Sequence, residues 1–353
     1  MATQLVKCPK CQETITASGE PNEKIFITCP KCNQKGFFTM PDENITKPLH
    51  TDSAAIEVQG LTKSYNHSTA VQNISFTVKK GEIFGFLGPN GAGKTTTIKA
   101  ILDLIHADTG TIKINGIDVQ SKSKEAKKYV GYMPEKVAFY DNLTAMQNLC
   151  FYAEIKHASK EECASLIEEF GLGDTGKKRV GKFSKGMVQR LGMARAVLGN
   201  PPILICDEPS GGLDPRGVVL IRNKIHDLKN KGTTIFVSSH ILSEIQEICD
   251  RVGIINKGVI VAQDTVEGLS SKLNLKPQIT VTVASMSPKI EKAVKKLAGV
   301  NSVNTQGNTL EIICEGASKA KVILAITDAG GSIQNLQTKE PSLEDVFMRY
   351  TEA

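Results

Sequence analysis

The feature that most constrains this chain is the run from Gly88 to Thr95, which reads GPNGAGKT. It fits the pattern GxxxxGK[ST], follows the apolar run Ile83–Leu87 and opens a helical pattern over Lys94–Ile105. Glycines let such a turn curl so that successive N–H groups point at phosphate oxygens, and the helix presents its positive end to the same anion. This context predicts a loop that binds a nucleoside triphosphate, with Lys94 reaching the terminal phosphates and the Thr95 hydroxyl ligating Mg²⁺.

Two acids follow a second apolar run. Ile203–Cys206 reads as a buried parallel strand and ends in Asp207 and Glu208. Because open α/β sheets bind ligands at the carboxyl ends of their strands, we expect both carboxylates beside the phosphate loop. Asp207 is expected to hold Mg²⁺ through water, and Glu208 to polarise the attacking water. Paired acids after a strand also fit a helix cap, but their position after the phosphate loop favours the catalytic interpretation.

The order of strand and helix patterns divides the chain. From about Ala54 to Lys272 short apolar strands alternate with helical patterns, which predicts an α/β fold. Beyond Pro277 the order is βαββαβ plus a helix, typical of a ferredoxin-like α+β domain. The expected segments are a cysteine module over 1–40, a polar linker over 41–53, the α/β domain over 54–273 and an accessory domain over 277–353. The accessory domain has no cluster of nucleophiles or metal ligands, so we expect it to serve packing or dimerisation.

Charge and hydropathy limit the partners. The 353 residues include 43 Lys and Arg against 37 Asp and Glu, a net charge of +6 that is spread along the chain. Nucleic acid would require that excess on one face, so the composition gives no electrostatic case for it. The longest apolar runs fall far short of the roughly 18 residues of a membrane helix, and the first residues do not fit a signal segment. We therefore expect a cytoplasmic protein that reaches the inner face of the membrane through a partner.

Four of the nine cysteines are paired as Cys8 with Cys11 and Cys29 with Cys32. Two C-x-x-C pairs at this separation fit a zinc ribbon, in which each pair forms a tight turn that places two sulfurs on one tetrahedral ion. About 40 residues with few large apolar side chains cannot bury enough surface to fold without metal. Four thiolates leave no open position, so we expect a structural Zn²⁺ site, with iron as the alternative metal.

A further motif, Phe183–Arg190, lies between the phosphate loop and the acids and reads FSKGMVQR. It resembles the signature sequence of ABC ATPases, whose usual form is Leu-Ser-Gly-Gly-Gln, and keeps the Ser and one Gly of that form. The variant Ser-Lys-Gly-Met with a following Gln-Arg is similar to ATPase subunits of type 2 ABC exporters. Pro341–Phe347 is similar to the end of drug- and polymer-exporting type 2 ATPases that carry an accessory domain.

Three more motifs extend the resemblance. Ser210–Asp214 resembles the D-loop, Ser238–His240 resembles the segment of the switch histidine, and Tyr65 matches the aromatic residue that stacks on adenine. With the phosphate loop, the signature and the acids, six motifs follow one order from Ile56 to about Gly268. The chain is identified as a member of the ABC transporter ATP-binding subunits, which implies a P-loop cassette fold.

One position departs from the family. Its Q-loop glutamine is replaced by Glu135, at the end of Gly131–Glu135. A carboxylate still suits Mg²⁺ coordination but adds negative charge beside the phosphates, and glutamate is common in exporters of the type suggested above. The segment of about 136–180 corresponds to the family's helical subdomain, which docks on a permease.

The resemblance implies an active site divided between two protomers, with two ATP molecules sandwiched in a head-to-tail homodimer or in a heterodimer with a paralogous cassette. The implied catalytic residues are Glu208, His240 and Lys94. The implied ATP and Mg²⁺ contacts are Tyr65, Gly88, Pro89, Asn90, Gly91, Ala92, Gly93, Lys94, Thr95, Thr96, Glu135 and Asp207. The signature and D-loop residues that would act on the opposite protomer's nucleotide are Ser184, Lys185, Gly186, Met187 and Asp214.

The expected function is an ATP-hydrolysing motor subunit coupled to a separately encoded, multi-helix membrane permease. The alternative is a soluble ABC ATPase that acts on nucleic acid, ribosomes or a protein partner through the zinc ribbon. Such proteins usually carry two cassettes or a long coiled-coil insertion, and the sequence has neither. A regulatory protein that only binds ATP is disfavoured by Glu208 and His240. The cargo is not encoded here, because the ATPase subunit does not touch it.

Overall fold

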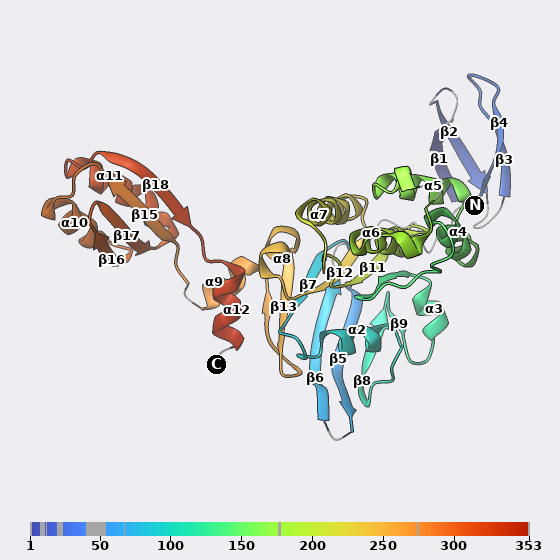
Figure 1. Ribbon diagram of the computed structural model, residues 1–353, viewed down its shortest axis with the longest axis horizontal. Coiled ribbons are helices and arrows are strands. Elements are labelled where there is room, and N and C mark those ends of the chain that lie inside the picture. Colours follow the sequence, from blue (N-terminus) through green and yellow to red (C-terminus); the bar gives the residue numbers. More distant parts are fainter. Residues whose placement is uncertain are drawn as a thin grey trace.

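The computed structural model describes residues 2–7, 11, 13–19, 24–39, 54–66, 68–175, 178–273 and 275–351. Three parts follow one another along the chain: two N-terminal hairpins, a cassette with two sheets, and a small C-terminal domain (Figure 1). Among the described residues, no helix has the length and apolar character needed to cross a membrane.

The cassette is built on a six-stranded sheet with the order β10-β11-β12-β7-β13-β14. Its strands are β7 (Ile83–Leu87), β10 (Val130–Met133), β11 (Ile203–Asp207), β12 (Thr234–Ser239), β13 (Arg251–Asn256) and β14 (Val259–Asp264). All neighbours pair in parallel except β13 and β14. Because helices cover a parallel sheet on both faces, β7, β11 and β12 are buried along their whole length. The predicted α/β fold is confirmed.

A second, antiparallel sheet has the order β6-β5-β8-β9. Its strands are β5 (Ala54–Tyr65), β6 (Ser68–Lys79), β8 (Thr109–Ile114) and β9 (Ile117–Asp118). Phe76 of β6 stacks on Phe84 and Phe86 of the central sheet, with ring centroids 5.7 and 5.4 Å apart. The two sheets therefore share one aromatic core above β7.

Helix α2 (Lys94–Ile101) follows the phosphate loop directly. The sequence predicted this helix to Ile105, but it ends four residues earlier, where Asp103 takes a left-handed φ of 47°. The other cassette helices are α3 (Ser123–Lys127), α4 (Ala145–Lys156), α5 (Lys160–Glu169), α6 (Lys185–Val197), α7 (Pro215–Asn230), α8 (Leu242–Ile248) and α9 (Val266–Lys272). Short 3-10 turns lie at Gly173–Thr175 and Val180–Lys182.

The C-terminal domain has a four-stranded antiparallel sheet with the order β16-β17-β15-β18. Its elements are β15 (Gln278–Val283), α10 (Pro288–Lys295), β16 (Val300–Gln306), β17 (Thr309–Cys314), a 3-10 turn (Gly316–Ser318), α11 (Lys319–Asp328) and β18 (Ile333–Lys339). Its alternating strands and two helices bury a separate apolar core that includes Ile279, Val294 and Ile326. The order matches the ferredoxin-like domain that the sequence predicts.

The last helix, α12 (Leu343–Thr351), leaves this domain and packs on the cassette. Leu343 and Val346 are fully buried in the cassette core, where α12 contacts α8, α9, β13 and β14. The side-chain oxygen of Gln246 in α8 accepts a 2.7 Å hydrogen bond from the Leu343 N–H and caps the helix start. In Figure 1, α12 lies beside α9, apart from the accessory sheet.

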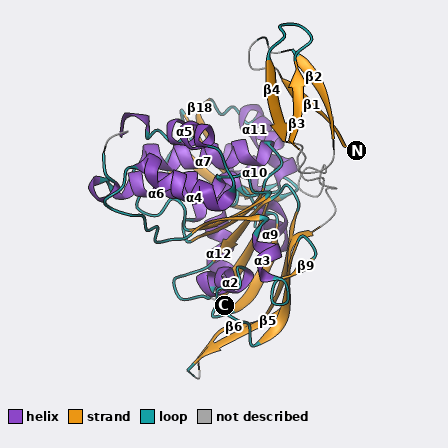
Figure 2. Cartoon of the chain, turned by 90° about the vertical axis from the view of Figure 1, so that its right-hand side faces the viewer, coloured by secondary structure: helices purple, strands orange, loops and turns teal. Residues whose placement is uncertain are grey.

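The N-terminal hairpins pair β1 (Ala2–Lys7) with β2 (Thr14–Gly19) and β3 (Lys24–Thr28) with β4 (Lys35–Thr39). They lie side by side and outside the cassette sheets in both ribbon views (Figures 1 and 2). In each hairpin, one cysteine pair lies in the sequence between the two strands.

Candidate functional site

The phosphate loop joins β7 to α2 in a turn that requires glycine. A Cβ atom on Gly88 would lie 2.4 Å from the main-chain oxygen of Ile255, and one on Gly93 would lie 2.6 Å from that of Ala70. Gly91 and Gly93 have φ angles of 81° and 109°, which other residues rarely adopt. Gly93 gives α2 no side-chain cap, so the first N–H groups of the helix are available to an anion.

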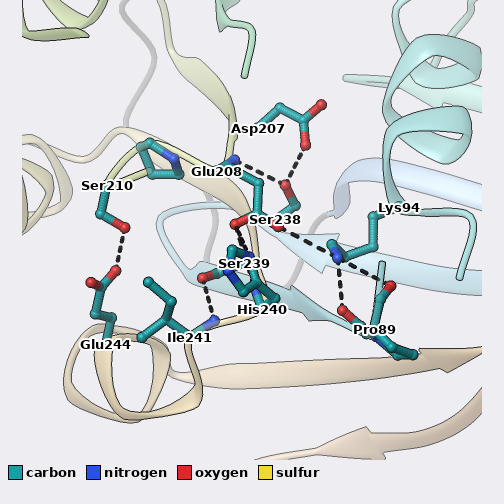
Figure 3. Close-up of polar contacts among 12 residues, drawn as sticks. Pro89, Lys94, Asp207, Glu208, Ser210, Ser238, Ser239, His240, Ile241 and Glu244 are labelled. Atoms are coloured by element: carbon teal, nitrogen blue, oxygen red, sulfur yellow. Dashed lines mark hydrogen bonds and ion pairs between the residues drawn. The ribbon is translucent and has the colours of Figure 1, made fainter. Parts of the chain in front are cut away.

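Lys94 points back across this loop. Its Nζ donates to the main-chain oxygens of Gly88 and Pro89, over 2.7 and 3.3 Å, and lies 3.4 Å from Oε1 of Glu208 (Figure 3). The side chain is buried, so these oxygens satisfy its charge inside the protein. Phosphate oxygens in the loop would offer the same ammonium group stronger acceptors.

Glu208 and His240 meet at the carboxyl ends of two neighbouring strands. Oε2 of Glu208 lies 2.7 Å from Nδ1 of His240 (Figure 3). The same oxygen accepts a 3.4 Å hydrogen bond from the main-chain N–H of His240. Glu208 has a φ of 51°, which turns its side chain away from the line of β11. The carboxylate thus lies between an ammonium group and an imidazole, a suitable place for orienting a water molecule.

Asp207 is 1% exposed and is held by hydroxyl groups. Ser238 Oγ donates a 2.6 Å hydrogen bond to Asp207 Oδ1 and accepts from the N–H of Glu208 over 3.2 Å (Figure 3). Burial raises the pKa of Asp207 above its usual range, while the hydroxyls of Ser238 and Thr95 counteract that shift. A buried carboxylate beside a phosphate loop is suited to Mg²⁺, which would remove the cost of its charge.

The site also contains polar contacts that the sequence did not reveal. Gln189 of α6, only 3% exposed, donates its side-chain amide to the main-chain oxygens of Pro209 and Glu208, over 3.1 and 3.4 Å. The sequence does indicate that Gln189 is buried, because it lies four residues before Met193 on the apolar face of this helix. A buried polar side chain needs a hydrogen-bond partner. Beyond Glu208, the hydroxyl of Ser210 is hydrogen-bonded to the carboxylate of Glu244 in α8 (Figure 3).

The phosphate loop, Glu208, His240 and Gln189 line an open pocket of about 800 Å³. The expected site residues in its lining are Pro89, Asn90, Gly91, Gly93, Lys94, Thr95, Thr96, Glu135, Lys185, Glu208 and His240. Gly88, Ala92 and Asp207 are buried beneath it. Tyr65, 44% exposed at the end of β5, is outside the lining, and Lys63 Nζ lies 5.5 Å from its ring centroid.

The signature and D-loop residues lie mainly outside this pocket. Its lining includes Lys185 but not Ser184, Gly186, Met187 or Asp214. Ser184 Oγ accepts from the N–H of Met187 and caps α6, and Asp214 Oδ1 accepts from the N–H of Gly217 and caps α7. Three of the four expected metal ligands, Cys11, Cys29 and Cys32, have sulfur atoms within 4.8 Å of one another, whereas Cys8 lies outside the described residues.

Known protein families match two parts of the chain. The family described as ABC transporter matches residues 71–211, and that of the ATP-binding protein DrrA1-3-like, C-terminal domain, matches residues 273–351. The linearmycin resistance ATP-binding protein LnrL of Bacillus subtilis (strain 168) is 35% identical over 304 residues, which cover 84% of this chain and 98% of LnrL. The bacitracin transport ATP-binding protein BcrA of Bacillus licheniformis is 46% identical over 213 residues, 60% of this chain and 70% of BcrA. The daunorubicin resistance ATP-binding protein DrrA2 of Streptomyces coeruleorubidus is 30% identical, over 85% of this chain and 96% of DrrA2.

Solved structures share the cassette fold. The ATP-binding subunit of an ABC transporter superposes with a TM-score of 0.59 at 32% identity, over 63% of this chain and 94% of that chain. The dimeric bacterial ABC transporter cassette MJ0796 gives 0.56 at 23% identity, over 60% of this chain and 98% of that chain. The solved structures confirm the P-loop cassette, and the family match over residues 273–351 confirms the DrrA-like C-terminal domain. This chain is an ATPase that belongs to the ABC transporter ATP-binding subunits, in the exporter subfamily of DrrA and BcrA.

Proposed function

We propose that this chain is the motor subunit of a two-component exporter, in which ATP binding closes a head-to-tail dimer and hydrolysis reopens it. One observation carries the proposal: Lys94, Glu208 and His240 line the pocket, whereas Ser184 caps α6 outside its lining. The start of α6 offers N–H groups to a second anion, and Lys185 next to Ser184 reaches the lining of the phosphate-loop pocket. Two such chains in opposite orientation complete two sites.

Within one site, each side chain has a separate task. Thr95, Asp207 and Glu135 would hold Mg²⁺, which together with Lys94 would neutralise charge on the phosphates. Glu208 orients the attacking water, and His240 contacts the terminal phosphate while fixing the Glu208 carboxylate through their 2.7 Å contact. Tyr65 stacks on the adenine ring from its exposed place at the end of β5.

The partner that receives this motion is a separately encoded membrane permease at the inner face of the membrane. Its docking surface is the helical subdomain of about 136–180, where Tyr140, Phe151 and Ile155 are 49%, 43% and 65% exposed. Exposed large apolar side chains on adjacent turns fit a protein interface. The names of LnrL, BcrA and DrrA2 refer to linearmycin, bacitracin and daunorubicin, which supports an antibiotic as the class of cargo.

We also propose Mg²⁺ as the cofactor of hydrolysis and one structural Zn²⁺ held by Cys8, Cys11, Cys29 and Cys32. The three described sulfur atoms within 4.8 Å of one another support the zinc assignment. Zinc is favoured because the spacing of the two C-x-x-C pairs fits a zinc ribbon, and iron is the alternative metal for four thiolates.

The central test is Glu208→Gln. Removing the carboxylate should lower ATP turnover by about a hundredfold or more, since it removes the group that orients water. The same variant should elute as an ATP-dependent dimer in size-exclusion chromatography with light scattering. Hydrolysis at the wild-type rate would refute the assigned role of Glu208.

Gly186→Asp in the Glu208→Gln background separates the dimer from the binding site. A Cβ atom on Gly186 meets Leu213 at an ordinary 3.5 Å, and an acid in the first turn of a helix is stabilising, so the protomer should fold and bind ATP. The added charge would repel phosphates of the opposite protomer and abolish the dimer. A dimer that persists in this double variant would contradict the head-to-tail arrangement.

A tagged wild-type chain, purified from native membranes in mild detergent, should bring down a multi-helix permease.

A further inference from the structure

The N-terminal module, residues 1–39, lacks an apolar core in its described part. Among the module residues whose burial is described, Cys29 is the one buried side chain, at 1% exposure, whereas Phe26 is 58% exposed. Two-stranded hairpins are marginally stable by themselves in water. The apolar clusters of the cassette include no described residue of the module.

Thiol groups converge where that core would be. The sulfur atoms of Cys11, Cys29 and Cys32 lie within 4.8 Å of one another, and Cys11 Sγ and Cys29 Sγ are 3.6 Å apart. Two sulfurs on one tetrahedral zinc ion, each about 2.3 Å from it, lie about 3.8 Å apart. A disulfide would need about 2.05 Å. The observed separation therefore fits a shared metal ion and excludes a disulfide.

The backbone forms a tight turn from Cys29 to Gln34. Cys29 N donates to Gln34 O over 2.9 Å, and Cys29 O accepts from Asn33 N over 3.0 Å. The latter hydrogen bond closes the turn that contains Cys32, and the left-handed φ of 55° at Asn33 turns the chain toward β4. Such a turn presents two sulfurs to one ion.

An ion pair links the two cysteine turns. Lys31 Nζ lies 2.8 Å from Glu13 Oε2, but the two side chains are 64% and 40% exposed. An exposed pair contributes little to stability. It joins the two turns at the surface, whereas the sulfur atoms of Cys11, Cys29 and Cys32 converge within the module.

We infer that the metal ion is the core of the N-terminal module, so that the module folds and unfolds with metal binding while the ATPase cassette stays folded. The inference rests on the zinc ligands proposed above and deepens that proposal. Thiolates must bind the ion to be stable inside the module, because a buried charge without a partner is costly. Metal loading thereby decides whether the chain displays a folded N-terminal surface.

The test uses the full-length protein and two readouts. Metal content is measured by inductively coupled plasma mass spectrometry, and folding by hydrogen–deuterium exchange resolved by peptide. We expect one zinc ion per chain and protected amides in β3 and β4, at Lys24–Thr28 and Lys35–Thr39. Removing the metal with a chelator should abolish that protection and leave β7 and β11 unchanged. Adding Co²⁺ should restore protection and produce the visible absorption of a tetrahedral thiolate complex.

Cys29→Ser and Cys32→Ser should each lose the metal and the protection of both hairpin strands. Cys150→Ser is the matched control, since Cys150 is a partly buried cysteine of α4, and it should keep one metal ion and the protected hairpin. Protection that survives complete metal removal would overturn the inference, even if zinc binds. Bound iron in place of zinc would overturn the zinc proposal and leave the inference standing. A chain with no metal and a protected hairpin would overturn both.

Discussion

Gln189 donates its side-chain amide to the main-chain oxygen of Pro209 over 3.1 Å and so ties α6 to the turn that carries Glu208. The contact is buried, and a second hydrogen bond of 3.4 Å reaches the carbonyl of Glu208 itself. The same helix begins at Ser184, the residue proposed to face the nucleotide of the opposite protomer. The side-chain amide of Gln189 thus connects the helix that begins at Ser184 to the turn that carries the proposed catalytic Glu208.

Gln189→Leu should lower kcat about ten- to a hundredfold, because two buried carbonyls lose their donor and Glu208 shifts from its productive position. The KM for ATP should change less, since the phosphate loop is untouched. Steady-state ATPase assays separate the two parameters. Gln120→Leu makes the same chemical change at an exposed position and should leave both unchanged. A raised KM with normal kcat would assign Gln189 to ATP binding and contradict the positioning role.

Asp207→Asn should make the nucleotide-free protein more stable at neutral pH. Burial raises the pKa of Asp207, so its contribution to stability is full below the ordinary aspartate pKa and is lost as pH rises through the raised pKa. The gain in Tm of the variant should therefore be larger at about pH 8 than at about pH 5, and amount to a few degrees.

The test is a Tm series across pH with Asp227→Asn, an exposed aspartate of α7, as the control without such a trend. Mg²⁺ with ATP should stabilise the wild type and have little effect on Asp207→Asn, because the metal ligand is gone. An equal gain at both pH values would contradict the burial argument.

Leu343→Ala should destabilise the cassette by about 2 to 5 kcal/mol, because it empties a fully buried site between α12 and the cassette. Urea unfolding and the exchange of α12 amides measure the effect. Leu324→Ala, in α11 at 60% exposure, removes the same atoms and should change stability by less than about 0.5 kcal/mol. Equal effects of the two substitutions would show that α12 does not dock as described.

Gly88→Ala should abolish ATP binding, since its Cβ would lie 2.4 Å from the Ile255 oxygen and the loop must move. Fluorescent nucleotide titration measures the loss. Gly316→Ala adds the same methyl group where no atom lies within 4 Å, and it should bind ATP normally. Wild-type affinity in Gly88→Ala would mean that the loop accommodates a side chain.

The motifs could be predicted from sequence because their residues lie close together along the chain. The phosphate loop, the strand that ends in Asp207 and the βαββαβ order each depend on local patterns. Contacts between distant segments could not be predicted in this way. Ser238 is one of two adjacent serines in β12, and nothing in its local sequence shows that its hydroxyl reaches Asp207, 31 positions earlier.

The last helix is a clearer case. Leu343, Val346 and Phe347 follow the spacing of an apolar helix face, so the helix itself is predictable. The surface that covers this face is not, because periodicity says that a partner exists and not which one. Likewise the end of α2 depends on Asp103 taking a left-handed backbone conformation, which aspartate adopts only in some contexts.

The docking of α12 has a consequence for synthesis. A ribosome makes the other cassette elements and the accessory sheet before α12, so Leu343 and Val346 complete the apolar cluster beside α8 only after both. A nascent or truncated chain therefore exposes an apolar gap next to the helix that follows His240. Exposed apolar surface attracts chaperones and proteases, so α12 protects the cassette as well as completing its core.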